Sequence, residues 1–413
     1  MPTPEQSQRD ADRRGLGGAR IVLGVTGGIA AYKAADLTSK LVQVHADVRV
    51  VMTEAASRFV QPLTFQALSH HRVFSDVFSG WDDGERGHVA LAAEADVLLI
   101  APATADIIAR LAAGMVDDML TAVALATSAP LVIAPAMEHH MWHHPATRAN
   151  VDALRTRGAT IVEPEAGYLA SGALGDGRLA SPDRVMAALR VVLGRGGPLD
   201  GKRVVITAGG TREALDPVRY LGNRSTGTMG LALVDAAIDL GADVLLIAGP
   251  TIVTLPGGVG VIAVESASEM AEAVWRETAT ADVLIMAAAV ADFRPRQRSL
   301  QKIKKATGQE SLDLDLVRNP DIIAETRHPN LLKVGFAAET ENLEHYALQK
   351  AKSKGLAMIV ANDAVKTIGN ADSEATLVFP DGPAVTLPSM AKSQLAARIM
   401  AEIVGLIEKK LHD

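Results

Sequence analysis

Residues 20–33 read Arg-Ile-Val-Leu-Gly-Val-Thr-Gly-Gly-Ile-Ala-Ala-Tyr-Lys, an apolar run that ends in two glycines and continues in a helical pattern. Arg20–Val25 predicts a strand, and the residues from about Ile29 to Val44 predict a helix. A glycine turn between them lets the backbone approach a ligand, and free N–H groups at a helix start favour a phosphate. The stretch predicts an α/β fold with a candidate phosphate site at Gly27 and Gly28, although such turns are also common without a ligand.

The alternation of apolar runs and helical stretches continues through the first half of the chain. Further strands are predicted at 48–52, 96–101, 131–134 and 160–162, and helices start near Thr104, Asp117 and Pro145. Such alternation is typical of a parallel sheet covered by helices on both faces. Ligands bind beyond the carboxyl ends of these strands, so the segment after each strand is a candidate for chemistry.

The same pattern restarts after a segment rich in glycine and proline at 194–202, which we interpret as a linker. The second series has strands near 203–207, 244–248, 261–264, 282–287, 333–336 and 358–361, and helices near 229–240, 267–280, 342–355 and 390–410. We therefore predict an α/β protein of two doubly wound, Rossmann-like domains, at 19–193 and 203–413. The polar residues 1–18 predict a disordered lead-in.

Composition excludes several classes of function. The 413 residues contain no cysteine, which excludes disulfides, thiolate metal sites and cysteine nucleophiles. The net charge of −7 argues against a general nucleic-acid or anionic-membrane binder. No apolar run has the roughly 18 residues of a membrane span, and the polar start does not read as a signal peptide. We expect a soluble, cytoplasmic protein without nucleic-acid or membrane partners.

Four segments of the first half directly follow predicted strands. They are VTGGIAAYK at 25–33, MTEAA at 52–56, APATAD at 101–106 and PAMEHHMW at 135–142. Together with GMVDDML at 114–120 and GYLASGALGDGR at 167–178, they resemble the homo-oligomeric flavin-containing cysteine decarboxylases. The resemblance covers residues 20–190 and implies FMN bound between subunits. The candidate FMN contacts are Gly27, Gly28, Ile29, Thr53 and Thr104.

The resemblance implies a reaction and its catalytic positions. FMN oxidises the terminal thiol of 4′-phosphopantothenoylcysteine, CO2 leaves, and return of the electrons with a proton produces 4′-phosphopantetheine. The matching positions are His88, Glu138 and Ser171, where the family usually has Asn at the second and Cys at the third.

These departures from the family pattern have chemical consequences. An ionised glutamate only accepts hydrogen bonds and would repel a substrate carboxylate. A serine hydroxyl is also a poorer proton donor than a thiol, whose pKa is about 8.5. With Asp106 in place of the usual Asn, they predict slow decarboxylation, a different acid, or accumulation of an oxidised product.

Histidines near these positions allow other interpretations. His139, His140, His143 and His144 include two pairs with the i,i+4 spacing of a helix face, which is compatible with metal ligation. No HExxH pattern or acidic third ligand is evident, so a solvated segment that positions Glu138 is the favoured interpretation. For His88, a hydrogen-bonded surface histidine is the alternative to a base.

The second half carries its own ordered series of motifs. VITAGGTRE at 205–213 lacks the GxGxxG spacing of a dinucleotide site, which disfavours a nicotinamide dehydrogenase. It is followed by DPVRYLGNRSTG at 216–227, MAAAVADF at 286–293, KIKK at 302–305, NPDII at 319–323 and VGFAAET at 334–340. In this order, the motifs resemble the phosphopantothenate–cysteine ligase half of the bifunctional coenzyme A biosynthesis enzymes, in which the decarboxylase half also comes first.

The lysines of this half suit triphosphate chemistry, which needs concentrated positive charge and a metal ion. Lys302, Lys304 and Lys305 supply charge from one segment, and Lys350 and Lys354 from another. An isolated KIKK is usually a solvated face. Lys350 and Lys354 repel each other at i,i+4, and an anion between them would relieve that repulsion.

The ligase resemblance implies specific roles. CTP activates the carboxylate of 4′-phosphopantothenate as an acyl-cytidylate, which the amine of cysteine then attacks. Asn223 contacts that carboxyl group, Lys302 takes part in catalysis, and Asp292 contacts the nucleotide or Mg2+ unless it only caps a turn. The implied CTP contacts are Met286, Ala287, Ala288, Asp292, Lys302, Pro320, Asp321, Ile322, Ile323, Phe336, Lys350 and Lys354. Thr228 stands where the family often has a lysine.

The favoured hypothesis is a bifunctional enzyme with both activities. The resemblance further implies trimers of the first domain and dimers of the second, which combine into a dodecamer. One alternative is an active ligase beside a flavin domain that decarboxylates poorly and is mainly structural. A binding module without catalysis is another, since related eukaryotic proteins with the flavin-domain fold inhibit a protein phosphatase.

Overall fold

The computed structural model describes residues 15–77, 87–304, 310–339, 343–363, 370 and 372–412. The chain forms two compact units, one that ends at Arg195 and one that begins at Gly196. Residues 1–14 of the predicted lead-in lie outside the described part. Leu16 within that lead-in is fully buried in the first core, so ordered structure begins earlier than predicted, because an apolar side chain there completes the packing.

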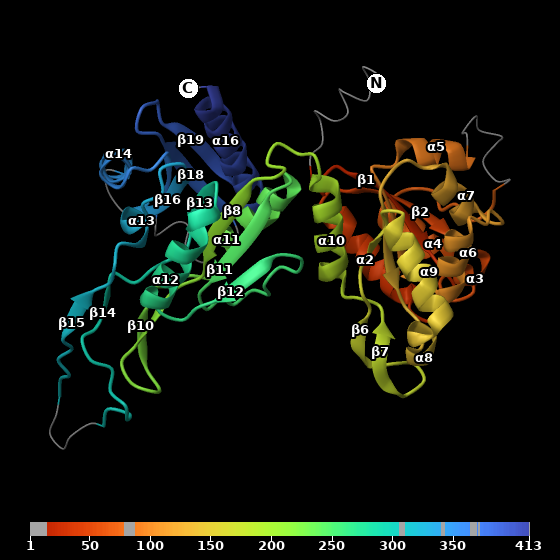
Figure 1. The fold of residues 1–413 in the computed structure, drawn as a ribbon, viewed down its shortest axis with the longest axis horizontal. Coiled ribbons are helices and arrows are strands. Elements are labelled where there is room, and N and C mark those ends of the chain that lie inside the picture. The colour runs from red at the N-terminus through yellow and green to blue at the C-terminus, as the bar shows by residue number, and fades with distance from the viewer. Residues whose placement is uncertain are drawn as a thin grey trace. The chain divides into compact units, whose positions relative to one another are not determined.

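The first unit is built on a parallel sheet of five strands in the order β2-β1-β3-β4-β5 (Figure 1). The strands are β1 (Arg20–Val25), β2 (Asp47–Met52), β3 (Val97–Ala103), β4 (Leu131–Pro135) and β5 (Thr160–Ile161). This is the flavodoxin-like doubly wound order, in which the strand sequence reverses between β1 and β3. The predicted fold class is confirmed for this unit.

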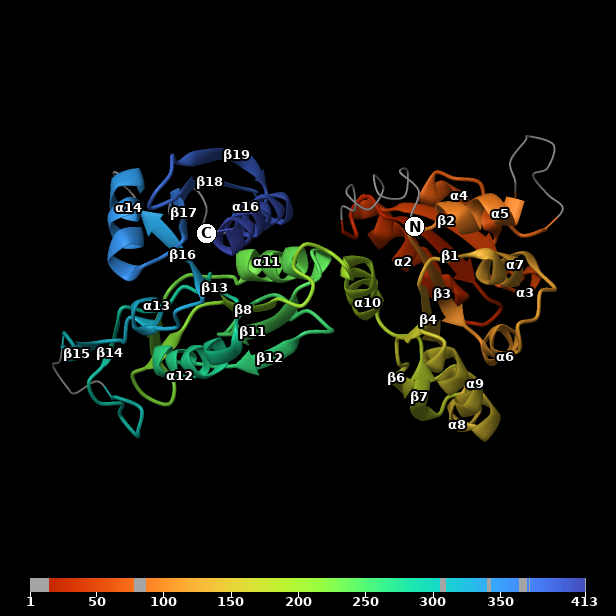
Figure 2. The same ribbon diagram turned by 45° about the horizontal axis from the view of Figure 1, so that its top comes forward.

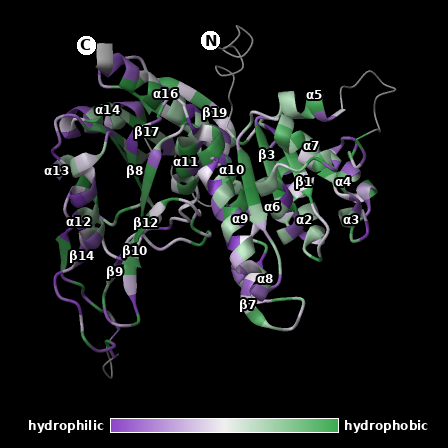
Figure 3. Ribbon diagram, turned by 45° about the vertical axis from the view of Figure 1, so that its right-hand side comes forward, coloured by the Kyte–Doolittle hydropathy of each residue, from purple (hydrophilic) through white to green (hydrophobic). Residues whose placement is uncertain are grey.

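Helices cover both faces of this sheet (Figure 2). They are α2 (Ala31–Gln43), α3 (Glu54–Ser57), α4 (Pro62–Ser69), α5 (Gly87–Glu94), α6 (Ala105–Ala113), α7 (Met119–Ala126), α8 (His139–His143), α9 (Pro145–Thr156) and α10 (Pro182–Gly194). Ile21 and Leu23 of β1 pack with α2 and α10, whereas Val22 packs with α6, α7 and α9. Because both faces of the sheet are covered, the central strand β3 is buried at every position and apolar throughout, as its hydrophobic colouring shows (Figure 3).

A two-stranded hairpin follows β5 and was not predicted from the sequence. It consists of β6 (Glu165–Tyr168) and β7 (Leu174–Arg178), which pair antiparallel. The hairpin lies beside α8 in both views (Figures 1 and 2). The N–H of Met137 donates to the Gly177 carbonyl oxygen at 2.9 Å, which docks β7 onto the segment after β4. Its glycine-rich strands bury little apolar surface, so they carry no alternating pattern.

The second unit has an eight-stranded sheet in the order β12-β11-β8-β13-β16-β17-β18-β19. Its strands are β8 (Arg203–Ala208), β11 (Asp243–Ala248), β12 (Gly260–Ala263), β13 (Val283–Met286), β16 (Leu332–Glu339), β17 (Met358–Asp363), β18 (Asp372–Val378) and β19 (Val385–Ala391). In chain order this is 3-2-1-4-5-6-7-8, the Rossmann order with two added strands. The predicted fold class is confirmed here too, with its switch point between β8 and β13.

The two added strands change the parallel sheet that the sequence predicted. β18 pairs antiparallel with β17, and β19 pairs antiparallel with β18. β18 alternates buried and less buried residues, and β19 is mostly exposed or half-buried. The sheet is therefore mixed, and these edge strands lack the continuous apolar run by which the other strands were predicted.

Helices cover both faces of the second sheet as well. They are α11 (Thr228–Asp239), α12 (Ala267–Glu277), the 3-10 helix η1 (Thr278–Thr280), α13 (Ile322–Glu325), α14 (Leu343–Lys354) and α16 (Lys392–His412). α11 and α16 pack on one face, and α12, α13 and α14 on the other. Leu199 of the predicted linker is fully buried in the core with α11, and its N–H donates to the Leu240 carbonyl oxygen, so this part of the segment belongs to the second unit.

Two short antiparallel ribbons project near the switch point of the second unit. One joins β9 (Arg212–Ala214) to β10 (Tyr220–Gly222), and the other joins β14 (Phe293–Pro295) to β15 (Leu316–Arg318). The β9–β10 ribbon follows β8 in the chain and the β14–β15 ribbon follows β13, the two strands that flank the switch point. Over the described residues, no helix combines the length and apolar character of a membrane span.

Candidate active sites

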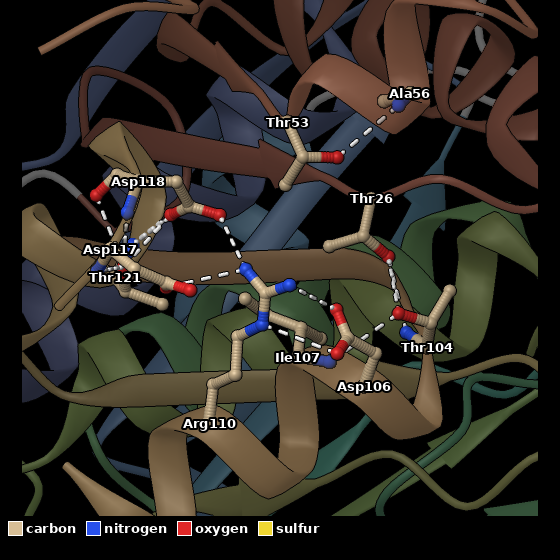
Figure 4. Close-up of polar contacts among 10 residues, drawn as sticks. All are labelled: Thr26, Thr53, Ala56, Thr104, Asp106, Ile107, Arg110, Asp117, Asp118 and Thr121. Carbon is tan, nitrogen blue, oxygen red and sulfur yellow. Dashed lines mark hydrogen bonds and ion pairs between the residues drawn. The ribbon is translucent and has the colours of Figure 1, made fainter. Parts of the chain in front are cut away.

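The first candidate site lies at the carboxyl ends of β1 and β3, where the strand order reverses. Thr26 is buried there, and its hydroxyl donates to the Pro102 carbonyl oxygen at 2.7 Å. It also accepts from the Thr104 N–H at 3.1 Å (Figure 4). These bonds hold the two post-strand segments together, and Thr104 then caps α6 by accepting from the Ile107 N–H.

A cavity of about 540 Å³ opens at this point. Gly27 is required beside it, because a side chain at that position would collide with Ala55 at the start of α3. Four segments line the cavity: the glycine turn with the start of α2, the segments after β3 and β4, and the β6–β7 hairpin. The lining residues are Gly27, Gly28, Ile29, Ala30, Tyr32, Lys33, Pro102, Thr104, Ala105, Ala136, Met137, Glu138, Met141, Tyr168, Leu169, Ala170, Ser171, Gly177, Arg178 and Leu179. The lining is mainly apolar with a few charged groups, as in sites for flat organic ligands.

Two cations line the cavity, and sequence reasoning missed both. Lys33 lies in the first turn of α2, and Arg178 ends β7. Burial and the nearby Arg178 charge lower the pKa of Lys33, and Glu165 offsets part of this effect. The signal that could have found Lys33 is its position in the first turn after the glycine pair, where a phosphate would also meet the helix N-terminus.

Glu138 and Ser171 both line this cavity, although 33 positions separate them in the sequence. The Glu138 carboxylate caps α8, where it accepts from the His140 N–H at 2.6 Å and from the Met141 N–H. Ser171 lies in the exposed loop between β6 and β7. The structure therefore brings together two of the three positions predicted for decarboxylation.

His88 and Thr53 do not line the cavity. His88 lies in the first turn of α5, and its Nδ1 is buried without a hydrogen-bond partner among the described residues. Thr53 caps α3 by accepting from the Ala56 N–H at 3.2 Å (Figure 4). Within one chain, the predicted histidine base is therefore separate from Glu138 and Ser171.

Asp106 belongs to an ion-pair cluster on the surface rather than to the cavity lining. The Arg110 guanidinium lies 3.1 Å from a carboxylate oxygen of Asp106, 3.3 Å from Asp117 and 3.4 Å from Asp118 (Figure 4). Asp118 also caps α7 in a capping box with Thr121. Through Arg110, Asp106 thus helps to connect the start of α6 to the start of α7. An asparagine at position 106 could still accept a hydrogen bond from Arg110, but without the added strength of an ion pair.

The residues of the first cavity fit FMN. The N-cap of α2, Ala30, provides no side-chain bond to the helix start, which leaves this end suited to a phosphate. Lys33 supplies a positive charge in the first turn of α2. Apolar side chains such as Ile29 and Met141 suit the aromatic ring system of the flavin.

The second candidate site lies at the switch point of the second unit and has a cavity of about 460 Å³. Its lining is Met286, Ala288, Val290, Ala291, Asp292, Phe293, Arg318, Asn319, Pro320, Asp321, Ile322, Ile323, Gly335, Phe336, Lys350, Lys354, Leu356 and Ile359. All the residues predicted to contact CTP line it except Ala287 and Lys302. The structure thus gathers four separate segments of the sequence around one space.

Asn319 connects two of these segments, and sequence reasoning did not assign it a role. Its N–H donates to the Asp292 carbonyl oxygen at 2.9 Å, and its Nδ2 donates to the Ala291 carbonyl oxygen at 2.7 Å. These bonds hold the segment after β13 against the segment before α13. The Asp292 side chain is exposed at the cavity and is available as an oxygen ligand.

Lys350 and Lys354 share one face of α14 and both line the second cavity. The Lys354 ammonium lies 2.6 Å from a carboxylate oxygen of Asp321. The repulsion between the two lysines is therefore already reduced by a protein carboxylate, and no bound anion is needed to explain their proximity. Lys350 remains the better placed of the two to offer a full charge to a phosphate group.

Lys302 lies outside the cavity, on a segment held by the ion pair between the buried Asp216 and the exposed Arg219. The Asp216 side chain is buried and accepts from the Ile303 N–H at 3.1 Å, and the Arg219 guanidinium donates to the Ile303 carbonyl oxygen at 2.8 Å. Hydrogen bonding from Arg219 lowers the pKa of Asp216 strongly, against the opposing effect of burial. Lys302 and Lys304 flank the residue that is held, and Lys305 lies outside the described residues.

The residues that hold Ile303 lie close in the sequence to Asn223, the predicted contact of the substrate carboxyl group. Asp216 and Arg219 precede β10, and Asn223 follows it directly. The Asn223 Nδ2 donates to the Val290 carbonyl oxygen at 3.1 Å, next to the segment that carries Asp292. Thr228, in the position where a lysine was expected, contacts the hydroxyl of Thr226 at 2.8 Å at the start of α11.

Two doubly wound domains in series, each with a ligand-sized cavity at its switch point, define a two-domain α/β protein of the kind that binds nucleotides or flavins. The chain matches the Flavoprotein family over residues 10–193. It matches the DNA/pantothenate metabolism flavoprotein C-terminal domain over residues 199–406.

Relatives match over nearly the full length. The coenzyme A biosynthesis bifunctional protein CoaBC of Bacillus subtilis is 47% identical over 400 residues, which cover 95% of this chain and 98% of that protein. CoaBC of Vibrio cholerae is 46% identical and covers 93% of this chain and 98% of that protein. The solved C-terminal domain of a CoaBC protein is 38% identical and spans 52% of this chain and 100% of that chain, with a TM-score of 0.45.

The chain therefore belongs to the family of bifunctional coenzyme A biosynthesis proteins. It is an enzyme whose first half is a flavoprotein decarboxylase and whose second half is a ligase.

Proposed function

We propose that the second unit joins cysteine to 4′-phosphopantothenate at the expense of CTP, and that the first unit decarboxylates the product with FMN. The observation that carries the ligase proposal is the second cavity, where Asp292, Lys350 and Lys354 come together from separate segments. Paired cations with a carboxylate at a switch point suit a triphosphate and its metal ion.

In the ligase step, the carboxylate of 4′-phosphopantothenate attacks the α-phosphate of CTP, and pyrophosphate leaves. The amine of cysteine then attacks the acyl carbon, CMP leaves, and an amide forms. Lys350 neutralises phosphate charge, Asp292 holds Mg2+, and Lys354 is oriented by Asp321. Asn223 would contact the carboxyl group, and Lys302, next to the held Ile303, would supply further positive charge to the phosphates.

Replacing Asn223 with Asp is expected to lower kcat/KM for 4′-phosphopantothenate by about 100-fold, because a carboxylate repels the substrate carboxylate and cannot donate to the Val290 carbonyl oxygen. Release of pyrophosphate and CMP at varied 4′-phosphopantothenate concentration, in the presence of CTP, Mg2+ and cysteine, measures this kcat/KM. Asn330→Asp, an exposed change elsewhere in the same unit, is the control and keeps the normal rate. Wild-type rates for Asn223→Asp would remove this residue from the site.

In the decarboxylase step, FMN supplies oxidation of the terminal thiol and later returns the electrons. Lys33 and the start of α2 bind phosphate, and Arg178 stabilises negative charge on the substrate. Ser171, on the hairpin loop at the cavity, would donate the proton that the decarboxylated intermediate takes up as the electrons return. The Glu138 carboxylate binds the α8 N–H groups, which reduces its repulsion of a substrate carboxylate.

Replacing Ser171 with Cys is expected to raise the rate of 4′-phosphopantetheine formation by about 10- to 100-fold, because a thiol is the better proton donor. Mass spectrometry of products from added 4′-phosphopantothenoylcysteine measures the rate. Ser128→Cys, in an exposed turn of the same unit, controls for the added thiol. An unchanged rate would mean that proton donation from position 171 does not limit turnover.

We further propose that the chain acts as a homo-oligomer, up to the predicted dodecamer. Apolar side chains at the first cavity are exposed in the single chain, with Ile29 at 59% and Tyr168 at 73%. A second copy over this mouth would cover them. A cytoplasmic location stays a prediction.

A second candidate function is an active ligase beside a flavin domain that decarboxylates poorly, which Glu138 and Ser171 favour. The purified protein, given 4′-phosphopantothenate, cysteine, CTP and Mg2+, distinguishes the two. Formation of 4′-phosphopantetheine and CO2 supports both activities. Accumulation of 4′-phosphopantothenoylcysteine supports the ligase alone, and consumption of neither substrate contradicts the whole proposal.

A further inference from the structure

A cluster of metal-ligating side chains lies beside the first cavity but does not line it. His139 and His143 stand one helical turn apart on α8, and Asp176 lies on β7. One ring nitrogen from each histidine and one carboxylate oxygen all lie within 4.8 Å of one another. The acidic third ligand that the sequence did not reveal is therefore supplied by a strand 33 residues beyond His143.

The three side chains already contact one another. The Nε2 of His143 lies 3.1 Å from a carboxylate oxygen of Asp176, and the Asp176 N–H donates to Nδ1 of His139 at 3.2 Å. The two imidazole rings have their centroids 4.5 Å apart. All three groups are partly exposed, so an ion from solvent can reach them without unfolding the core.

The backbone around the cluster is arranged for a close approach. Gly175 precedes Asp176, and a Cβ at that position would lie 2.8 Å from the His139 ring. The Met137 N–H also donates to the Gly177 carbonyl oxygen at 2.9 Å. Glycine at 175 therefore permits β7 to approach the His139 ring, and the bond to Gly177 holds β7 against the segment before α8.

We propose that His139, His143 and Asp176 bind a divalent transition-metal ion of the Zn2+ class, with water in the remaining position. Two imidazoles and one carboxylate form the type of ligand set that suits Zn2+, Co2+ or Ni2+ better than Mg2+ or Ca2+. To bind through these atoms, the cation must displace two existing contacts. They are the His143–Asp176 pair and the hydrogen bond from the Asp176 N–H to His139.

The bound ion ties the β6–β7 hairpin to α8. The hairpin carries the Ser171 loop and α8 begins at the Glu138 cap, so both elements that border the first cavity meet at the cluster. Metal binding is therefore expected to slow amide exchange in residues 168–176. This inference does not depend on the proposed reactions.

Isothermal titration of ZnCl2 into the full-length, tag-free protein, previously dialysed against EDTA, tests the site. We expect one ion per chain, and a loss of affinity of at least about tenfold in both His143→Gln and Asp176→Asn. These substitutions keep side-chain volume at partly exposed positions. His140→Gln, on the same short helix outside the cluster, is the matched control and keeps the affinity.

Hydrogen exchange of residues 168–176 with and without ZnCl2 provides the second measurement. Slower exchange in the wild type and in His140→Gln, but not in the two cluster variants, supports the site. Absence of binding in the wild type overturns the proposal. Equal binding in all variants also overturns it, because the ion would then lie on other histidines.

Discussion

Replacing Lys350 with Gln is expected to lower kcat/KM for CTP by about 100-fold, with little change in the melting temperature. Lys350 lines the second cavity from α14 and forms no ion pair with the residues that the structure describes, whereas Lys354 already pairs with Asp321. A charged hydrogen bond to a phosphate contributes about 2 to 3 kcal/mol, which is the source of the expected factor. Pyrophosphate release at varied CTP concentration measures it.

Lys352→Gln is the matched control, because Lys352 lies on the same helix but is exposed and does not line the cavity. We expect wild-type kinetics from this variant. Decarboxylation of added 4′-phosphopantothenoylcysteine is expected to be unchanged in both. Equal, small effects of the two substitutions on ligation would contradict the placement of the triphosphate in the second cavity.

Replacing Asp216 with Asn is expected to reduce ligation by about 100-fold through the segment that carries Lys302. The buried Asp216 carboxylate accepts from Val218, Arg219 and Ile303 N–H groups and pairs with the Arg219 guanidinium. Loss of the charge replaces a charge-assisted contact with Arg219 by a weaker one at a buried position and weakens the hold on Ile303. Pyrophosphate release measures the ligase rate, and hydrogen exchange at the Ile303 amide, which is expected to accelerate, measures the position of the segment.

Asp315→Asn tests whether any lost ion pair has this effect. Asp315 pairs with Arg296 at 2.6 Å, but both side chains are mostly exposed, so water replaces the lost contact at little cost. Normal ligation in this control with a strong loss in Asp216→Asn supports a positioning role. A slow ligase with unchanged Ile303 exchange would contradict it and would indicate a general loss of stability instead.

The strands that the sequence predicted are those with continuous apolar runs. β1, β3, β8 and β13 are buried on both faces, so nearly every side chain in them is apolar. β6, β7 and β19 were missed because their residues are mostly half-buried or exposed, and β18 because its buried residues alternate with less buried ones. Each pair forms a hairpin of strands that are close in the sequence, β6 with β7 and β18 with β19, and these strands lack the continuous apolar run that marks a strand buried on both faces.

The candidate sites divide in a similar way. The post-strand segments were predictable because parallel strands bring their carboxyl ends to one edge, so Gly27 and Thr104, or Met286 and Phe336, come together in any doubly wound sheet. The role of Asn319 was not predictable, since it depends on hydrogen bonds across segments, whereas Lys33 was missed although its position after the glycine pair is a local signal. His88 shows the opposite case, because its motif is present but its side chain does not reach the first cavity within one chain.

The sequence by itself determined the α/β class, the two domains and the order of the motifs. From these motifs it also predicted the protein family. Periodic burial and glycine turns are local properties, and they can be read one segment at a time. Only the tertiary structure decided that Asp321 neutralises Lys354, that Asp216 holds Ile303, and that Asp176 meets His139 and His143. Each of these contacts joins charged or polar groups from distant segments, and charge pairing acts through space and leaves no period in the sequence.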